Sequence, residues 1–274
     1  MLYFRESYER KEMDEKNPAE RRSKKSKKTE SGPEQHFDSL IHGWAFDPMS
    51  LSVRLIDMEG GRSVLLMRID LGVLQMETQG RPDGSTPNGS KTYLDYLLSV
   101  EQADSEFEMD ESQCFEADRE FVQYYHRRIS WLRLQNYRRA VEDADHTLAL
   151  MDVCRDHSPD EEWTISHEQY RPFVLFHRTQ ASALAALEED GPDKAVSEIT
   201  QGLTTIREVF IDNDAEEQFD EDEMVERLVE LRDSLRKEYT AGDALKERLA
   251  EAVASEQYEL AAQLRDEIAR RTEN

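Results

Sequence analysis

The chain has 274 residues, of which 38% are apolar and 35% charged, and its net charge is −25 at pH 7. This length suffices for one large domain or two small ones, and the negative charge opposes non-specific binding to nucleic acid. Apolar runs are shorter than the roughly 20 residues that cross a bilayer, and Met1–Arg10 lacks the apolar stretch of a secretory signal. Two cysteines cannot form a disulfide framework, so we expect a cytoplasmic protein.

Residues 1–36 differ in charge from the rest of the chain. They hold ten basic and eight acidic side chains, a surplus of two cations that leaves −27 on the remaining 238 residues. Six of the cations lie between Arg21 and Lys28, with almost no apolar residue nearby. This composition is typical of a disordered tail. We therefore do not expect nucleic acid as a partner, apart from weak binding of its phosphates by the basic segment Arg21–Lys28.

Residues 37–103 are expected to form a small β-rich domain that a helix closes. Alternating apolar residues at 51–56 and 63–69 flank Gly60 and Gly61, a pattern typical of a β-hairpin. Residues 71–77 predict a third strand with a bulge at Gly72, because a glycine inside a strand often marks one. The closing helix is expected to begin at Lys91.

Residues 104–211 predict a domain of antiparallel helices. From Asp118 onward, apolar residues recur at intervals of three and four, with interruptions at 158–160 and 190–193. Residues 125–150 resemble a tetratricopeptide repeat, in which a small residue lets two helices approach and bulky residues fill the angle between them. The match rests on Trp131, Tyr137, Ala140 and Leu148.

Residues 176–203 resemble a second and looser copy of this repeat, with Ala195 in the place of Ala140. Gln135 stands where the repeat usually has glycine, and Pro192 stands where an aromatic residue is usual. Two copies are also fewer than the usual three or more. The sequence leaves open whether these helices bind a peptide in a groove or only pack against the β-rich domain.

Residues 212–240 predict an acidic linker followed by a connecting helix. Nine of the fifteen residues from Asp212 to Glu226 are acidic, which favours a solvated loop that leads into a helix N-terminus. Apolar residues at 224, 228, 231 and 235 then follow a heptad-like spacing. From residue 244 onward we expect two short helices around residues 255–257, each too short to be stable alone in water.

Residues 241–274 are thus expected to form a helical hairpin, and their sequence closely resembles the UVR motif. The matching residues are Leu245, Leu249, Ala252, Tyr258, Glu259, Ala261, Ala262, Leu264, Arg265, Asp266 and Ile268. This motif is found near the C-terminus of UvrB, inside UvrC, and in bacterial adaptors of Clp proteases and arginine kinases. The resemblance covers about a tenth of the chain and implies a bacterial protein whose hairpin docks a protein partner.

The predicted partner-binding residues lie on two apolar faces and a charged rim. Helical spacing places Leu245, Leu249, Ala252 and Val253 on one face, and Tyr258, Ala261, Leu264 and Ile268 on the other. The resemblance implies that Arg265 and Asp266 form the rim, that Glu259 frames the turn, and that Ala262 belongs to the motif. An alternative is that the charged side chains only form ion pairs that solubilise the hairpin.

No constellation of catalytic residues emerges from the sequence. Asp57, Asp70 and Glu77 are carboxylates on predicted strands, as in some metal-dependent nucleases, but no lysine lies two residues after Glu77. Cys154 and His157 are too few for a structural zinc site, which needs four ligands. A glycine-rich phosphate-binding loop is also absent. We therefore predict no catalytic residue, no metal and no cofactor.

The sequence predicts an α+β protein, mainly α, with an N-terminal β-hairpin domain, repeat-like antiparallel helices and a C-terminal helical hairpin. Its expected function is that of a non-enzymatic adaptor or scaffold, docked to another UVR-containing protein or to a Clp-type chaperone. The second interpretation is an accessory protein of nucleotide excision repair, associated with UvrB or UvrC. A remote third one is a metal-dependent hydrolase that uses the strand carboxylates. The oligomeric state is left open.

Overall fold

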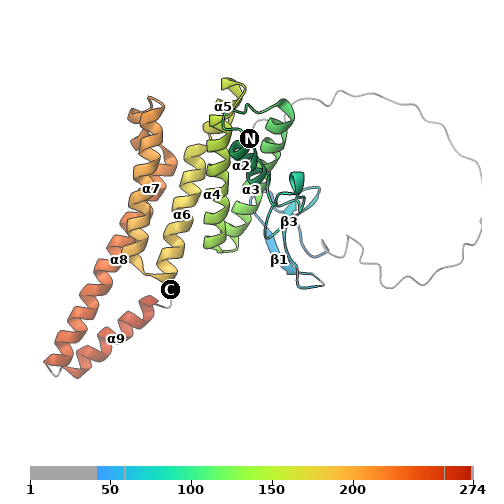
Figure 1. Cartoon of the computed structure of the whole chain (residues 1–274). Coiled ribbons are helices and arrows are strands. Elements are labelled where there is room, and N and C mark those ends of the chain that lie inside the picture. The colour runs from blue at the N-terminus through green and yellow to red at the C-terminus, as the bar shows by residue number, and fades with distance from the viewer. Residues whose placement is uncertain (1–41, 59, 256, 273–274) are drawn as a thin grey trace, which may run out of the picture. The chain divides into compact units, whose positions relative to one another are not determined.

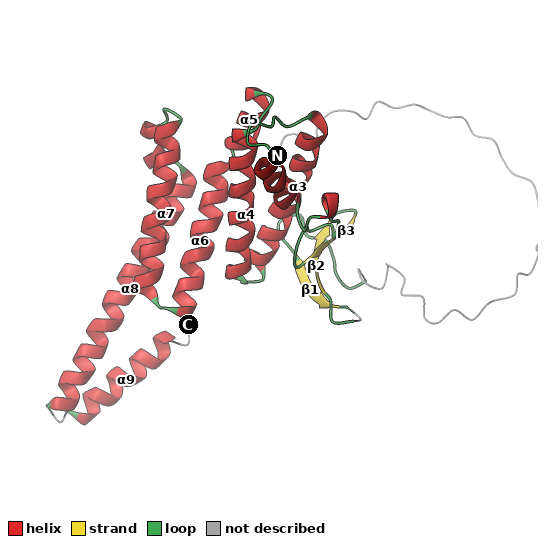
Figure 2. Cartoon of the chain, in the orientation of Figure 1, coloured by secondary structure: helices red, strands yellow, loops and turns green. Residues whose placement is uncertain are grey.

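The computed structural model of the protein describes residues 42–58, 60–255 and 257–272, and the fold below is that of Gly43–Thr272. The predicted tail, residues 1–36 with the basic segment Arg21–Lys28, lies outside the described residues. The described chain is mainly helical with one small sheet, as Figure 2 shows. The fold class expected from the sequence, α+β and mainly α, is confirmed.

The sheet has three antiparallel strands in the order β1-β2-β3: β1 Val53–Asp57, β2 Ser63–Ile69 and β3 Gly72–Glu77. Gly60 and Gly61, in the predicted hairpin turn, both adopt positive φ angles that favour glycine. The bulge predicted at Gly72 is wrong. Gly72 pairs with Ile69 and the register continues unbroken to Glu77, because the glycine begins the strand after a two-residue turn instead of interrupting it.

The two faces of the sheet bury different partners, as the two-residue period of a strand requires. Leu65, Met67 and Met76 pack in one apolar cluster with Trp131, Ala140 and Ala181 of the helices. Val64 and Leu66 point to the opposite face, where Trp44 covers them. The sheet therefore shares its main core with the helices.

Six helices follow the sheet: capping side chains mark the starts of the first four, and a proline in the first turn marks the starts of the last two. They are α2 Tyr93–Ala103, α3 Glu111–Arg133, α4 Tyr137–Asp156, α5 Glu161–Glu168, α6 Arg171–Glu189 and α7 Pro192–Asp212. Asp110 and Gln113 form a capping box, so α3 begins seven residues before Asp118, where the apolar periodicity alone suggested its start. A 3-10 turn, η1 Pro87–Gly89, precedes α2. None of the described helices is both long and apolar enough to span a bilayer.

Helices α3, α4, α6 and α7 lie side by side in chain order in Figure 1, and each packs on the next. Trp131 and Ala140 belong to one buried cluster, as expected for two helices that meet at a small residue. Gln135 turns the chain between α3 and α4 with a φ of 58°, a conformation that suits glycine better. These helices are antiparallel hairpins, and the tetratricopeptide assignment stays a prediction.

The C-terminal part consists of the 3-10 helix η2 Glu216–Glu221, the long helix α8 Glu223–Ala254 and α9 Tyr258–Thr272. The expected short first helix of the hairpin is wrong, because α8 continues without a break past residue 241. Gly242 is a helix breaker too weak to end α8, since a glycine costs only about 1 kcal/mol in a helix interior. Leu228 and Leu235 of α8 pack with α6 and α7, whereas Leu245 and Ala252 pack with α9.

A network of buried charges joins the first helices to the loop after the sheet. The Glu120 carboxylate is fully buried and accepts hydrogen bonds from the backbone N–H groups of Tyr93 (2.7 Å) and Leu94 (3.0 Å). It also contacts Nε of Arg81 at 3.2 Å and Nε2 of His146 at 2.9 Å. Because an unpaired buried carboxylate costs several kcal/mol, these groups must be in place together.

Two neighbouring arginines on α3 extend this network in different ways. Arg127 forms a bidentate ion pair with Asp143 and also donates to the carbonyl oxygens of Glu77 and Gly80. It thereby ties β3 to α3 and α4. Arg128 is buried as well, but it donates only to neutral groups, Thr147 Oγ1 at 3.0 Å and His177 Nδ1 at 3.3 Å. Burial lowers the pKa of Arg128 to about 10.

Helices α6 and α7 are in close contact at Gly202, which yields a first prediction. A Cβ atom there would lie 2.1 Å from Oγ1 of Thr179, so the helices must separate to admit alanine. We expect Gly202→Ala to lower the free energy of unfolding by about 1–3 kcal/mol, despite the higher helix propensity of alanine. Denaturant titration measures this loss. The Thr179→Ala/Gly202→Ala double variant should recover part of it, and no loss in the single variant would contradict the close contact.

The histidine beside Arg128 yields a prediction about pH. Burial, and then the Arg128 cation, lowers the pKa of His177 to about 3, so the folded protein does not protonate it until about pH 3. The unfolded chain takes up this proton near pH 6.5. The free energy of unfolding should therefore fall as the pH drops below 6.5, by at most about 1.4 kcal/mol per unit.

Denaturant titrations at pH values between about 6.5 and about 3 measure how steeply the free energy of unfolding falls with pH. His177→Asn should reduce this slope, because asparagine does not titrate. Equal slopes in the wild type and in His177→Asn would show that His177 is solvated in the folded protein.

Candidate functional site

The C-terminal hairpin is formed by the second half of α8 and by α9, which a short turn connects. Ser255 ends α8, with its N–H donating to Glu251 O at 2.9 Å. The N–H of Gln257 then donates to Ala252 O at 2.8 Å, and the N–H of Ala261 donates to Gln257 O at 2.9 Å. These bonds reverse the chain within one turn, so that α9 packs back on α8.

The seam between the two helices buries half of the predicted partner-binding residues. Its buried side chains are Leu245, Ala252, Ala261 and Leu264, and Leu249 and Ile268 are partly buried against them. The two alanines let the helix backbones approach closely. Leu245, Leu249, Ala261, Leu264 and Ile268 therefore hold the hairpin closed, and a partner reaches them only if the hairpin opens.

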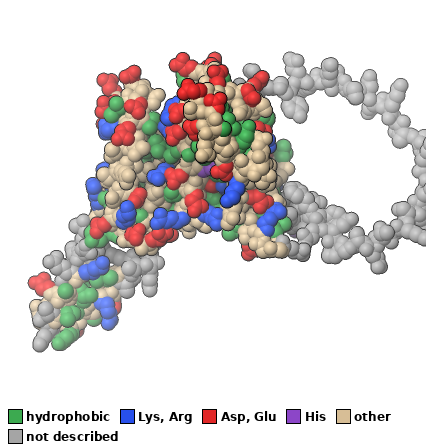
Figure 3. Space-filling model, in the orientation of Figure 1, with side chains coloured by type: hydrophobic (Ala, Val, Ile, Leu, Met, Phe, Trp, Pro, Cys, Tyr) green, Lys and Arg blue, Asp and Glu red, His purple; other side chains and the backbone are tan. Residues whose placement is uncertain are grey.

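Three large apolar side chains of the hairpin point to solvent instead. Tyr258 is 69% exposed, Val253 is 54% exposed and Leu260 is 37% exposed. Helical spacing places Val253 and Tyr258 on the two apolar faces, and the seam covers neither of them. Ala261 already meets the end of α8 at Ala252, so α8 offers no further turn to cover Tyr258. Figure 3 shows hydrophobic side chains gathered on the visible face of the hairpin.

The first turn of α9 carries a shallow hollow of about 470 Å³ beside these side chains, lined by Gln257, Tyr258, Glu259, Leu260 and Gln263. Glu259 is exposed there, in the first helical turn, where the negative charge of a carboxylate interacts favourably with the positive end of the helix dipole. The exposed apolar groups and this hollow are the surface of the hairpin that a partner can reach directly. We call it the hairpin tip: Val253, Tyr258, Glu259 and Leu260.

The charged residues of the motif lie farther along α9. Arg265 and Asp266 are exposed neighbours whose side chains form an ion pair at 3.0 Å. Nε of Arg270 donates to the backbone oxygen of Asp266 at 3.2 Å. Ala262 is half-buried beside the seam. The pair of Arg265 and Asp266 is thus intrahelical and exposed, which suits both a rim for a partner and the solubilising alternative.

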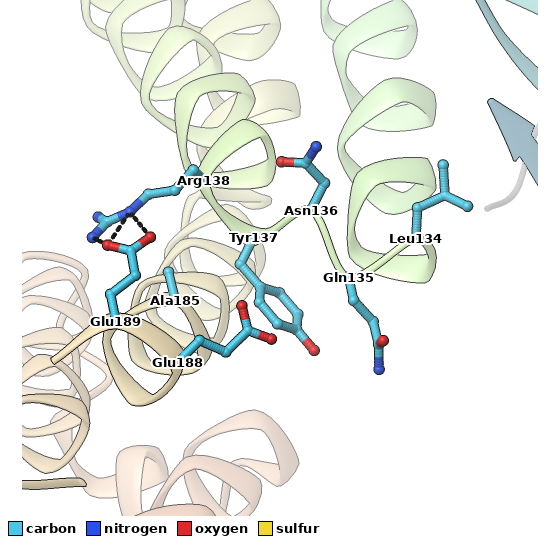
Figure 4. Close-up of a pocket in the computed structure, with 8 residues that line it drawn as sticks. All are labelled: Leu134, Gln135, Asn136, Tyr137, Arg138, Ala185, Glu188 and Glu189. Carbon is cyan, nitrogen blue, oxygen red and sulfur yellow. Dashed lines mark hydrogen bonds and ion pairs between the residues drawn. The ribbon is translucent and has the colours of Figure 1, made fainter. Parts of the chain in front are cut away.

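A second hollow, of about 290 Å³, lies where the α3–α4 turn meets the end of α6 (Figure 4), and no sequence pattern predicted it. Arg138 Nε donates to Glu189 Oε1 at 3.0 Å on one side of it. Burial, and then the Glu188 carboxylate, raises the pKa of Tyr137 on the other side. The hollow is lined by Leu134, Gln135, Asn136, Tyr137, Arg138, Ala185, Glu188 and Glu189. Its lining contains no Ser, Thr, Cys, His or Lys side chain, and its ion pair is satisfied within the chain.

The strand carboxylates do not converge on one site. Asp57 and Glu77 lie at one end of the sheet, where they contact Ser63 and Arg62, whereas Asp70 lies at the other end in the β2–β3 turn. Among the described residues, no group of three or more His, Cys, Asp or Glu side chains could hold a metal ion. The hydrolase interpretation therefore finds no site in this part of the chain.

Cys154 and His157, which the sequence offered as possible metal ligands, both make contacts within the core. Cys154 is buried in the apolar cluster around α2, and burial raises the pKa of its thiol. His157 lies next to the Phe107 carbonyl oxygen at 2.9 Å and to Glu101 at 3.2 Å. The two side chains thus serve the core where α2, α3 and α4 meet.

In a comparison with protein families, residues 243–270 match the UvrB/uvrC motif. The chain therefore carries a UVR motif, which confirms the resemblance seen in its sequence. All ten predicted partner-binding residues lie within it. No curated protein and no solved structure matched the chain. UVR motifs are protein-interaction modules in general, and this one spans the seam, the hairpin tip and the charged rim.

The division between seam and tip yields a prediction about stability. Leu264 is buried in the seam and Tyr258 is exposed at the tip, so alanine should act differently at the two positions. Leu264→Ala should lower the opening free energy of the α9 amides by about 2–5 kcal/mol. Tyr258→Ala should change it by less than about 0.5 kcal/mol. Hydrogen exchange of the α9 amides measures both values, and a large loss in Tyr258→Ala would place its ring in the seam.

Proposed function

We propose that the protein is a non-enzymatic adaptor that docks a protein partner on the hairpin tip. One observation carries the proposal: the tip presents Tyr258, Val253 and Leu260 to solvent within a UVR motif whose seam is already closed. Large apolar side chains that are exposed on a closed hairpin are removed from water only when another protein surface covers them, and this burial lowers the free energy of the complex. The tip is therefore the surface on which a partner acts.

The partner that fits best is another UVR-containing protein or a Clp-type chaperone. Proteins of both kinds belong to the systems in which UVR motifs occur. Tyrosine is favoured at the centre of protein interfaces because its ring buries a large apolar area while its hydroxyl finds a polar partner. Glu259 and the Arg265–Asp266 pair would then lie at the edge of the contact, where charges act on orientation and association rate.

The second candidate is an accessory protein of nucleotide excision repair, which would use the same hairpin on UvrB or UvrC. The motif itself supports this candidate, because it is the UvrB/uvrC motif that the chain matches. The two functions differ in their dependence on DNA. An adaptor should bind its partner equally well without DNA, whereas a repair accessory should bind UvrB or UvrC more tightly when damaged DNA is present.

The experiment measures binding of the full chain to purified UvrB, UvrC and a Clp-type chaperone, each with and without damaged DNA. We expect Tyr258→Ala and Leu260→Ala to weaken binding to the true partner by about tenfold or more, because burying such side chains contributes about 1.5–3 kcal/mol. Folding should be unchanged, since both side chains are exposed. Leu71→Ala is the matched control, an exposed apolar residue in the β2–β3 turn.

The same measurements can overturn the proposal. Binding that survives both tip variants would move the contact away from the tip. Tighter binding in Leu264→Ala would mean that the hairpin must open before it docks, because this variant weakens the seam. A hydrolytic activity of the purified protein that Asp57→Asn or Glu77→Gln abolishes would replace the adaptor by an enzyme.

A further inference from the structure

A second exposed apolar face lies on α3, far from the hairpin in sequence. Phe115 is 61% exposed and Val122 is 56% exposed. Seven residues separate them, which is two helical turns, so both side chains lie on the same side of α3. The neighbouring residues Cys114, Ala117 and Tyr124 face the core. Phe115 and Val122 are therefore not needed for packing within the described chain.

Helix α5 borders this stripe and extends it. Trp163 Nε1 donates to Asp118 Oδ1 at 3.1 Å, and His167 Nε2 lies 2.8 Å from the same oxygen. Asp118 falls between Phe115 and Val122 along α3, so α5 is held directly beside the stripe. The rings of Phe121 and His167 are tilted against each other, with their centres 4.6 Å apart. We call this surface the α3–α5 face: Phe115, Asp118, Val122, Trp163 and His167.

The surroundings of the face are strongly acidic. The exposed carboxylates at the starts of the two helices are Asp110, Glu111, Asp160, Glu161 and Glu162. Among the described residues from Glu111 to Val122 and in α5, Arg119 is the one cation, and it pairs with Glu116 and Asp83. Figure 3 shows acidic side chains beside hydrophobic ones at the α5 end of the helices.

We propose that the α3–α5 face docks a basic amphipathic helix of a partner protein. Its apolar side would cover Phe115 and Val122, and its Lys or Arg side chains would meet the carboxylates around them. The acidic surroundings of the face attract a basic helix and repel a partner that carries negative charge. A second copy of the chain, with a net charge of −25, a nucleic acid and an anionic membrane would each bring negative charge to an acidic rim.

This second surface gives the protein a role that the hairpin alone does not provide. An adaptor that holds one protein on the hairpin tip needs another surface for the protein that it delivers. The α3–α5 face does not share a residue with the tip, so each surface can be disabled alone. The inference therefore stands or falls independently of the proposed hairpin function.

The experiment uses the full chain and a fluorescent synthetic amphipathic helix of leucine and lysine as the probe. We expect saturable binding by anisotropy that weakens as salt rises. The double variant Phe115→Ser/Val122→Ser should lower the affinity about tenfold or more, since it removes two apolar anchors. Circular dichroism should show unchanged folding, because both side chains are exposed. Leu71→Ser serves as the control and should bind the probe as the wild type does.

Four results would overturn the proposal. The first is unchanged probe affinity in the double variant. The second is equal affinity for a probe in which glutamate replaces lysine, which would remove the charge argument. The third is a dimer of the wild-type chain, seen by sedimentation, that the double variant converts to a monomer, because the face would then bind a second copy. Loss of probe binding in Tyr258→Ala alone would assign the basic helix to the hairpin tip instead.

Discussion

The buried carboxylate of Glu120 is the constraint on which the N-terminal half of the structure depends. A charge removed from water is tolerated only when several donors surround it. Here its partners come from three places: the backbone N–H groups at the start of α2, which donate to it, Arg81 in the loop after the sheet, which forms an ion pair with it, and His146 on α4. Displacing any one of these segments removes a partner of the buried charge. The same requirement explains why the short sheet and the first helices share one core, with Arg127 linking β3 to the pair of α3 and α4.

The C-terminal half is organised by one continuous helix. The first half of α8 packs with α6 and α7, and its second half packs with α9. The hairpin is thus an extension of a helix that the main core already anchors. Such an arrangement suits a docking element, because the helices orient its exposed tip without having to cover it. The side chains that close the hairpin and those that meet a partner are also different residues, so stability and binding can vary separately.

The sequence predicted local structure well wherever the signal was local. The double glycine and the alternating apolar residues located the β1–β2 hairpin, and the helical periodicity located the helices. The misses were also local in origin. The start of α3 depended on the capping box of Asp110 and Gln113, which the apolar pattern does not contain. The break before residue 241 was expected from a motif boundary, yet motif boundaries impose no break on a helix. Tyr258 fitted the apolar period of α9, but period alone cannot tell whether α8 reaches far enough to cover it.

By itself the sequence determined the α+β class, the three strands, the helical hairpins and the UVR motif, because each follows from periodicity, turn residues or a specific short pattern. Tertiary structure decided what those patterns are for. Burial separated Leu264, which closes the seam, from Tyr258, which faces solvent, although both are apolar positions of one motif. It also brought α5 beside Phe115 and placed Glu120 among its donors. These outcomes depend on which helix ends where and on what lies opposite each side chain, and such long-range contacts leave no periodic trace in a single sequence.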